Sequence, residues 1–304
     1  MQTDTRRRLE WPTLVMLAST YIIWASGTVI WADSAALSLL LTALATAQFS
    51  SLQHEVLHGH PFRNQTLNEA LIFPGLLMWL PYQRFRDTHL AHHHDPNLTD
   101  PYDDPESNYH DPAVWARLPR WRQRLLRCNN TLLGRMTLGP FLGSVDFVIK
   151  DMALCRAGQS AVRRAWLWHG AGVALVAVWL IWVAQMPIWA YLVSNYLATA
   201  LLKIRTFLEH RAHDAFRART VVVEDRGPLA LLFLNNNFHV VHHMHPSEPW
   251  YRLPAIYAAR TQHYLRRNDD YRYPSYGAIF RRYFLTAKDP VPHPVWPVKK
   301  ADTP

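Results

Sequence analysis

The chain has 304 residues, of which 49% are hydrophobic and only 18% charged, with 13 Trp, 13 Tyr and 12 Phe. Its mean hydropathy of −0.14 is too low for a chain that lies wholly in a bilayer, so the composition indicates a membrane protein with sizeable polar parts. The net charge of +9 suits an anionic membrane face better than nucleic acid, and two cysteines exclude a disulfide framework.

Four apolar stretches are long enough to cross a bilayer as helices, because about 20 apolar residues span roughly 30 Å of hydrocarbon. The stretch 12–32 is followed by 34–53 with only Asp33 at the junction, which predicts a tight hairpin. A second pair at 165–184 and 187–208 repeats the pattern. The sequence therefore predicts an all-α membrane protein with four transmembrane helices in two hairpins.

Lys and Arg mark one end of each predicted helix and are absent from both hairpin tips. The basic residues at the marked ends are Arg6, Arg7, Arg8, Arg63, Arg163, Arg164, Lys203 and Arg205. By the positive-inside rule, both termini and the polar connections face the cytoplasm. We expect a single domain over 1–304, with a cytoplasmic helical cap formed by 54–164 and 209–304.

Three segments between the hairpins have distinct compositions. The run "ALIFPGLLMWLP" at 70–81 is too short to cross, which indicates a re-entrant or interfacial segment. The loop "DPNLTDPYDDPES" at 95–107 is interpreted as a solvated turn region, with cation binding as the alternative. The basic stretch 115–127 is typical of a helix on the membrane surface, or of one that holds an acidic head group.

The 17 histidines are concentrated in groups beside these helices. The groups are "HEVLH" at 54–58, "HLAHH" at 89–93 and "HVVHH" at 239–243, and "EHRAH" at 209–213 adds two more histidines. The spacings of three and four residues put the imidazoles of each group on one helix face.

The first group also fits H-E-x-x-H, the zinc peptidase motif in which Glu55 would be the base. That interpretation leaves the other two groups unexplained. A metal carrier is also disfavoured, because the histidines lie at helix ends rather than along a transmembrane path. Together the groups offer more imidazoles than one tetrahedral zinc can bind, so the sequence predicts two metal ions.

The three groups, in this order and spacing, resemble the histidine boxes of the integral-membrane fatty acid desaturase and hydroxylase family. The segment "NNNFHVVHHMHPSEPWYRLP" at 235–254 also resembles the family's N-x-H-x-x-H-H ending. The resemblance covers about 12–260. It implies a four-helix stem, a cytoplasmic cap and a non-haem di-iron centre held mainly by histidines.

The resemblance also implies which side chains hold the iron: those of the boxes and one further histidine after the fourth helix, for which both His210 and His213 qualify. The candidate ligands are His54, His58, His89, His92, His93, His210, His213, His239, His242 and His243. Glu55, Asp95 and Glu209 are candidates to orient ligand rings by accepting their distal N–H.

The implied activity is O2-dependent oxidation of unactivated C–H bonds by a membrane enzyme that uses two iron ions and takes O2 as co-substrate. A fatty acyl or lipid desaturase is the first interpretation, and a hydroxylase or ketolase of another apolar substrate is the alternative. The chain has no haem, flavin or cysteine-cluster motif, so we expect a separate electron donor, either a ferredoxin, a rubredoxin or a cytochrome b5-like protein. We expect a bacterial inner-membrane location with the active site facing the cytoplasm.

Overall fold

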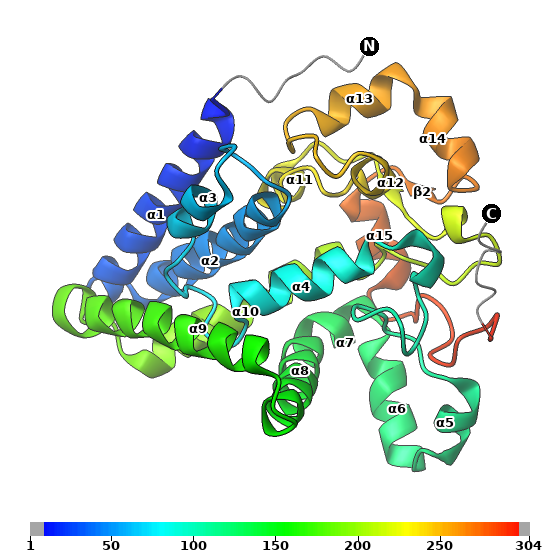
Figure 1. Ribbon diagram of the computed structural model, residues 1–304, viewed down its shortest axis with the longest axis horizontal. Coiled ribbons are helices and arrows are strands. Elements are labelled where there is room, and N and C mark those ends of the chain that lie inside the picture. The colour runs from blue at the N-terminus through cyan, green and yellow to red at the C-terminus, as the bar shows by residue number, and fades with distance from the viewer. Residues whose placement is uncertain (1–8, 298–304) are drawn as a thin grey trace. The chain divides into compact units, whose positions relative to one another are not determined.

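The computed structural model describes residues 9–297, and these are mostly helical (Figure 1). Two compact units make up the chain. The first comprises Met1–Arg84, Ser144–Thr199 and Pro249–Tyr251, and the second comprises Phe85–Gly143, Ala200–Glu248 and Arg252–Pro304. The expectation of a single domain over 1–304 stays a prediction, and Arg6, Arg7 and Arg8 lie outside the described residues.

The first unit contains the long apolar helices. Its elements are α1 (Trp11–Val29), η2 (Ile30–Ala32), α2 (Ala35–Leu57), α3 (Gln65–Leu71), the start of α4 (Tyr82–His92), most of α8 (Gly139–Arg156), α9 (Ser160–Trp179), the π-helical turn η4 (Leu180–Ala184) and most of α10 (Ile188–Thr206). Among the described residues, three spans are long and apolar enough to cross a membrane: Trp11–Ala32, Ala35–Leu57 and Ser160–Ala184. The fourth expected helix exists as α10, but it is less apolar than the other three. The count of four crossings is therefore not confirmed.

Helices α1 and α2 pack against each other as a hairpin (Figure 1). The Ser34 side chain caps α2 by accepting a hydrogen bond from the Leu37 backbone N–H at 3.4 Å. Gly27 permits the close approach, since a Cβ there would lie 3.0 Å from the Leu41 Cβ and from the Thr42 backbone nitrogen. The 3-10 turn η2, followed by Asp33 and Ser34, connects the two helices and confirms the tight hairpin.

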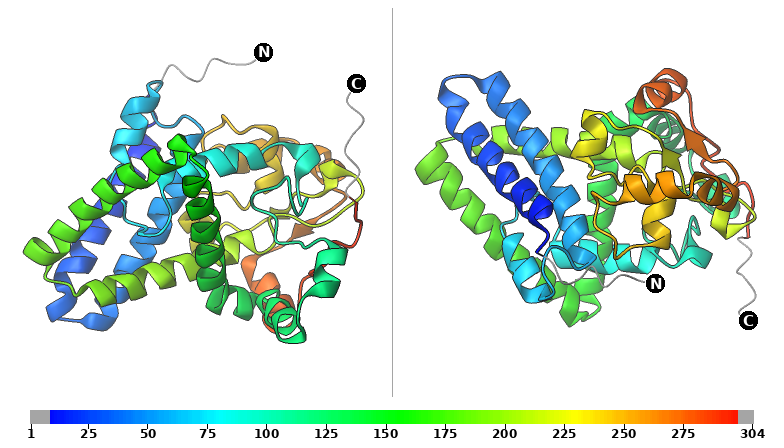
Figure 2. Two further views of the ribbon diagram at one scale, coloured as in Figure 1. Left: turned by 60° about the horizontal axis from the view of Figure 1, so that its bottom comes forward. Right: turned by 90° about the horizontal axis from the view of Figure 1, so that it is seen from above.

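Aromatic side chains connect α1 with α9 and α10 inside the first unit. Figure 2 shows the ribbons of these helices from two further sides. The Trp24 indole N–H donates to the Tyr191 hydroxyl at 3.1 Å, and Tyr191 donates in turn to the Leu76 carbonyl at 2.8 Å. The Trp179 indole donates to Thr28 Oγ1 at 2.9 Å. Each buried ring thus has a partner for its polar atom, as apolar surroundings require.

The segment 72–81 forms no helix, and side chains of α9 and α10 satisfy part of its backbone. His169 Nε2–H donates to the Met78 carbonyl at 2.9 Å, and Asn195 Oδ1 accepts from the Met78 N–H at 2.9 Å. Gly172 lets this backbone reach α9, because a Cβ there would lie 2.5 Å from the Phe73 carbonyl oxygen. Non-helical backbone at membrane depth is tolerated only when protein groups satisfy it in this way.

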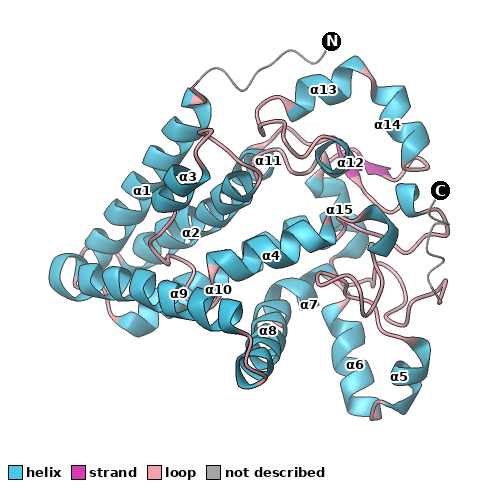
Figure 3. Ribbon diagram, in the orientation of Figure 1, coloured by secondary structure: helices cyan, strands magenta, loops and turns pink. Residues whose placement is uncertain are grey.

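The second unit is helical with one small sheet (Figure 3). Its elements are most of α4 (Tyr82–His92), η3 (Asp95–Asn97), α5 (Pro112–Arg117), α6 (Arg120–Asn129), α7 (Leu132–Thr137), the start of α8 (Gly139–Arg156), η5 (Phe216–Ala218), β1 (Val222–Val223), α11 (Pro228–Leu232), α12 (His239–Met244), α13 (Leu253–Ala259), α14 (Thr261–Arg267), β2 (Arg272–Tyr273) and α15 (Tyr276–Tyr283). Strands β1 and β2 pair in parallel, Val222 with Arg272 and Val223 with Tyr273.

The basic stretch 115–127 is divided between α5 and α6 rather than forming one helix. Pro119, with ψ 147°, separates the two helices, because it lacks an N–H and disfavours helical geometry in the residue before it.

A compact apolar cluster supports α12. It consists of Val222, Phe238, Val240, Val241, Leu253, Tyr257 and Tyr264, all buried. The Val240 N–H also donates to the Val221 carbonyl at 3.0 Å, which ties the first turn of α12 to the chain just before β1. The apolar face of α12 is thereby fixed, and its histidines are left on the other face.

We expect Asn195→Leu to lower the unfolding free energy by about 1–3 kcal/mol, because it leaves the Met78 N–H without its acceptor in a buried place. Thermal unfolding in detergent measures the effect. Leu197→Ala, at an exposed position of the same helix, is the control and should change stability by about 0.5 kcal/mol or less. Equal losses for the two variants would show that the Met78 bond is not stabilising.

Candidate metal centre

Helices α4 and α12 each present three imidazoles on one face. On α4 these belong to His89, His92 and His93, and the backbone extends the helical pattern by donating from the His93 N–H to the His89 carbonyl at 3.1 Å. On α12, His239 and His242 are buried on the face opposite Val240 and Val241. A period of 3.6 residues explains both arrangements.

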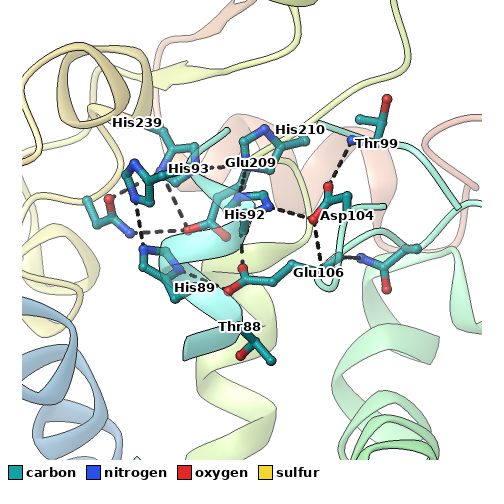
Figure 4. Close-up of polar contacts among 12 residues, drawn as sticks. Thr88, His89, His92, His93, Thr99, Asp104, Glu106, Glu209, His210 and His239 are labelled. Carbon is teal, nitrogen blue, oxygen red and sulfur yellow. Dashed lines mark hydrogen bonds and ion pairs between the residues drawn. The ribbon is translucent and has the colours of Figure 1, made fainter. Parts of the chain in front are cut away.

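Four imidazoles converge in the second unit: those of His92, His210, His239 and His243, with one nitrogen from each within 4.8 Å of the others. His92 Nε2 lies 2.8 Å and His239 Nε2 lies 3.0 Å from His210 Nε2 (Figure 4). His210 comes from the chain after α10, where it forms an isolated bridge with Thr220. Three segments distant in sequence therefore build this group.

The chemistry of this donor set fits a metal ion. His92 Nδ1 faces an Asp104 carboxylate oxygen at 2.8 Å, and His239 Nδ1 faces the amide oxygen of Asn236 at 3.2 Å. Both acceptors favour the tautomer with the proton on Nδ1, so each ring in its neutral form, the form that binds a metal, turns an Nε2 lone pair toward His210. One N–H of His210 cannot satisfy both lone pairs, whereas a cation between the rings would bind all of them.

A second set of imidazoles in the same unit belongs to His89, His93 and His242, whose ligand atoms also lie within 4.8 Å of one another. His93 Nε2 is 2.9 Å from His89 Nε2 and 3.1 Å from His242 Nε2. His89 Nδ1 donates to Glu106 Oε1 at 2.9 Å, which again directs the Nε2 lone pair into the group. The same donor chemistry is thus repeated.

His54 and His58 lie at the end of α2 in the first unit, with ring centroids 4.9 Å apart. Glu55 Oε2 accepts from the Trp250 backbone N–H at 3.1 Å, and its other oxygen is 3.9 Å from His54 Nδ1. The glutamate of the H-E-x-x-H pattern therefore accepts a backbone hydrogen bond and lies beside the first histidine of that pattern.

The acidic loop 95–107 supplies two of the carboxylates that orient these rings, and its interpretation as a solvated turn was wrong for both. Asp104 is only 5% exposed and accepts from the Thr99 N–H at 2.8 Å as well as from His92 (Figure 4). Glu106 bonds to His89. The sequence did contain a signal for this role, because the acidic cluster at 95–107 directly follows the histidine box at 89–93.

These carboxylates create a field that favours positive charge. Burial lowers the pKa of His92, but Glu106 and Asp104 outweigh it and raise that pKa to about 9. Burial also raises the pKa of Glu106, but His92 and the neighbouring His89 hold it far below its usual range. For His210, burial and the nearby His92 lower the pKa well below the usual value. The same field would stabilise a bound cation.

The other expected orienting groups have different outcomes. Glu209 Oε1 accepts from Arg205 Nε at 3.0 Å and from the Asn236 amide at 3.3 Å, and lies 3.9 Å from His239 Nδ1. It acts on that ring mainly through Asn236. The side chain of Asp95 lies outside the described part of the structure.

His213 does not join either group of imidazoles. Its Nδ1 accepts from the Ala215 backbone N–H at 3.1 Å, and its Nε2 lies 3.5 Å from an Asp269 carboxylate oxygen. Of the two histidines between which the sequence does not choose, the structure places His210 among the others and His213 beside an exposed acid.

Residues 7–276 match the fatty acid desaturase family. A part of the chain is also 38% identical over 77 residues to the beta-carotene ketolase of Paracoccus sp. (strain N81106 / MBIC 01143). That match covers 22% of this chain and 32% of the ketolase, so it spans about a third of the relative's length. The family match extends over most of the chain and confirms the resemblance carried by the three histidine boxes: the chain belongs to the fatty acid desaturase family.

Proposed function

We propose that this protein is a membrane-bound, O2-dependent di-iron oxidoreductase that acts on C–H bonds of a lipid-like substrate. The observation that carries the proposal is the pair of imidazole groups whose distal nitrogens are held by Asp104, Asn236 and Glu106. Iron ligation by histidine with carboxylate partners is consistent with this donor set. Membership of the fatty acid desaturase family supports the same chemistry.

The proposed ligands of one iron are His92, His210, His239 and His243. For the other we propose His89, His93 and His242 together with His54 and His58, which form the first histidine box of the chain. The last two are assigned from the family pattern and their spacing on α2. His213 lies outside the proposed ligand set, because its Nε2 faces Asp269.

Bound iron would supply the capacity to oxidise an unactivated C–H bond with O2. The chain's own residues hold the rings for it: Asp104 and Glu106 keep the proton of His92 and His89 on Nδ1, which presents Nε2 to the metal. Asn236 does the same for His239. Removal of such partners typically costs 10–100-fold in metal affinity or activity.

Fatty acyl or lipid desaturation is the proposed reaction, and ketolation or hydroxylation of an apolar substrate is the alternative. The short match to a beta-carotene ketolase favours the alternative, whereas the family description favours the first. The same metal centre would serve desaturation and ketolation or hydroxylation, because the position of the substrate decides whether it loses hydrogen or gains oxygen.

Mass spectrometry of the products separates these reactions. The iron-loaded protein would be supplied in parallel with a fatty acyl substrate and with beta-carotene, and with a reduced ferredoxin, rubredoxin or cytochrome b5 as electron donor. We expect loss of two hydrogens from an acyl chain if it is a desaturase, and gain of oxygen if it is a ketolase or hydroxylase. Absence of O2 consumption with every donor and substrate would contradict the oxidoreductase proposal.

His210→Ala should lower the iron content of anaerobically purified protein from close to two ions per chain to about one, because His210 Nε2 faces the nitrogens of His92 and His239. His213→Ala is the matched control in the same loop and should keep both ions. Elemental analysis and iron spectroscopy measure the difference. A protein that binds one zinc per chain and is active with it would refute the di-iron proposal.

We also propose that both termini and the histidine groups face the cytoplasm of a bacterial inner membrane. The Lys and Arg asymmetry supports this orientation, the family is membrane-bound, and three apolar helices are long enough to cross. The substrate would then enter from the bilayer, and the electron donor would approach from the cytoplasm. No nucleic-acid partner is proposed.

Cysteine labelling tests the orientation. In a background with Cys128 and Cys155 replaced by Ser, Ser34→Cys at the first hairpin tip should react with an impermeant thiol reagent added outside intact cells. Ser107→Cys should react only after the membrane is opened. The opposite pattern would reverse the proposed topology.

A further inference from the structure

The first unit contains a cavity of about 430 Å³ whose lining includes none of the candidate metal ligands. It lies among α2, α3, the non-helical chain after α3, and α9. Apolar groups from Ile72, Phe73, Pro74 and Trp168 line it, together with a few polar side chains. A volume in this range and a mixed lining of this kind are typical of sites for small organic molecules.

Gln53 is a polar residue of this cavity whose buried side-chain oxygen has no hydrogen-bond partner among the described residues. Its side chain is only 4% exposed, and its Oε1 is buried without a hydrogen bond to any described residue. A buried amide oxygen left unpaired costs about 1–3 kcal/mol in protein mutational data. Because Gln53 lines the cavity, a hydrogen-bond donor on a bound molecule would satisfy it.

The charges around the cavity restrict the chemistry of that molecule. Glu69 is the acidic residue of the lining, and none of the described lining residues is Lys or Arg. His169 directs its Nε2–H to the Met78 carbonyl, so that proton is already used within the protein. A carboxylate or phosphate head group in the cavity would lie near the Glu69 carboxylate without a Lys or Arg in the lining to bind it, whereas a hydroxyl would donate to Gln53.

We propose that this cavity binds an apolar molecule that carries a neutral hydroxyl group, with the hydroxyl donating to Gln53 Oε1 and the hydrocarbon against Ile72, Phe73 and Trp168. Gln53 directly precedes His54 on α2, so the ligand would bind beside the helix turn that carries the first histidine box. The identification of this ligand as the substrate rests on the proposed oxidoreductase function. The binding of the ligand to the cavity does not depend on that function.

Competition binding to the purified full-length protein tests the site, with tritiated citronellol as the probe at fixed detergent concentration. The competitors are unlabelled citronellol, citronellic acid and β-citronellene, which present a hydroxyl, a carboxylate and no polar group on related branched skeletons. We expect the alcohol to compete about fivefold better than the hydrocarbon, as one neutral hydrogen bond predicts, and the acid to compete least.

Gln53→Leu should weaken citronellol binding about 2- to 10-fold and leave β-citronellene unchanged, so that the two ligands become equivalent. Gln48→Leu is the matched control: the same substitution on α2 at a residue that does not line the cavity, expected to keep the alcohol preference. Because Gln53 Oε1 has no partner to lose, the thermal midpoint of Gln53→Leu should not fall.

A wild-type protein that binds the acid best, or a Gln53→Leu protein that keeps the alcohol preference, would overturn the proposal. If the variant does not fold, the wild-type order of the three competitors decides. Measuring binding to both metal-free and iron-loaded protein separates the two proposals. Binding of the alcohol without oxidation of any substrate would support the cavity site and contradict the proposed enzyme function. Oxidation of a lipid without binding of the alcohol would support the enzyme function and contradict the cavity site.

Discussion

The hydrogen bond from His92 Nδ1 to Asp104 is the interaction on which the candidate metal centre most depends. An imidazole offers a metal only the nitrogen that has no proton, so the partner of the other nitrogen decides where the lone pair points. Asp104 is itself held by the backbone N–H groups of Thr99 and Glu106, which makes the loop after α4 part of the site. Glu106 and Asn236 repeat the arrangement for other rings.

Helix α12 shows how an ordinary core positions unusual chemistry. Val240 and Val241 are buried in an apolar cluster with Phe238 and Tyr257, and this fixes the rotation of the helix about its axis. With that rotation fixed, His239 and His242 must share the other face. Loss of the packing around Val240 and Val241 would therefore displace the imidazoles and lower the stability of the fold.

Polar residues within the apolar helices have a comparable role. Asn195 of α10 and His169 of α9 satisfy the backbone around Met78, where the chain does not form a helix. Asn195 lowers the hydropathy of α10 together with Lys203 and Arg205 at its end, so this 19-residue helix is not among the three most apolar spans. Gln53 differs from both, because its oxygen faces a cavity rather than backbone.

The sequence indicated the family through the resemblance of its three histidine boxes. Local periodicity indicated the apolar helices and the histidines that share a face on α4 and α12, because the helix period relates residues three or four apart without tertiary structure. It could not choose between His210 and His213, which lie in non-helical chain after α10 where no period applies. It also missed Asp104 and Glu106, since only the folded loop brings these carboxylates to rings 12 and 17 residues away. Only tertiary structure places His210 beside His92 and His239, and the two carboxylates beside His92 and His89, because the paths of loops depend on the contacts they make.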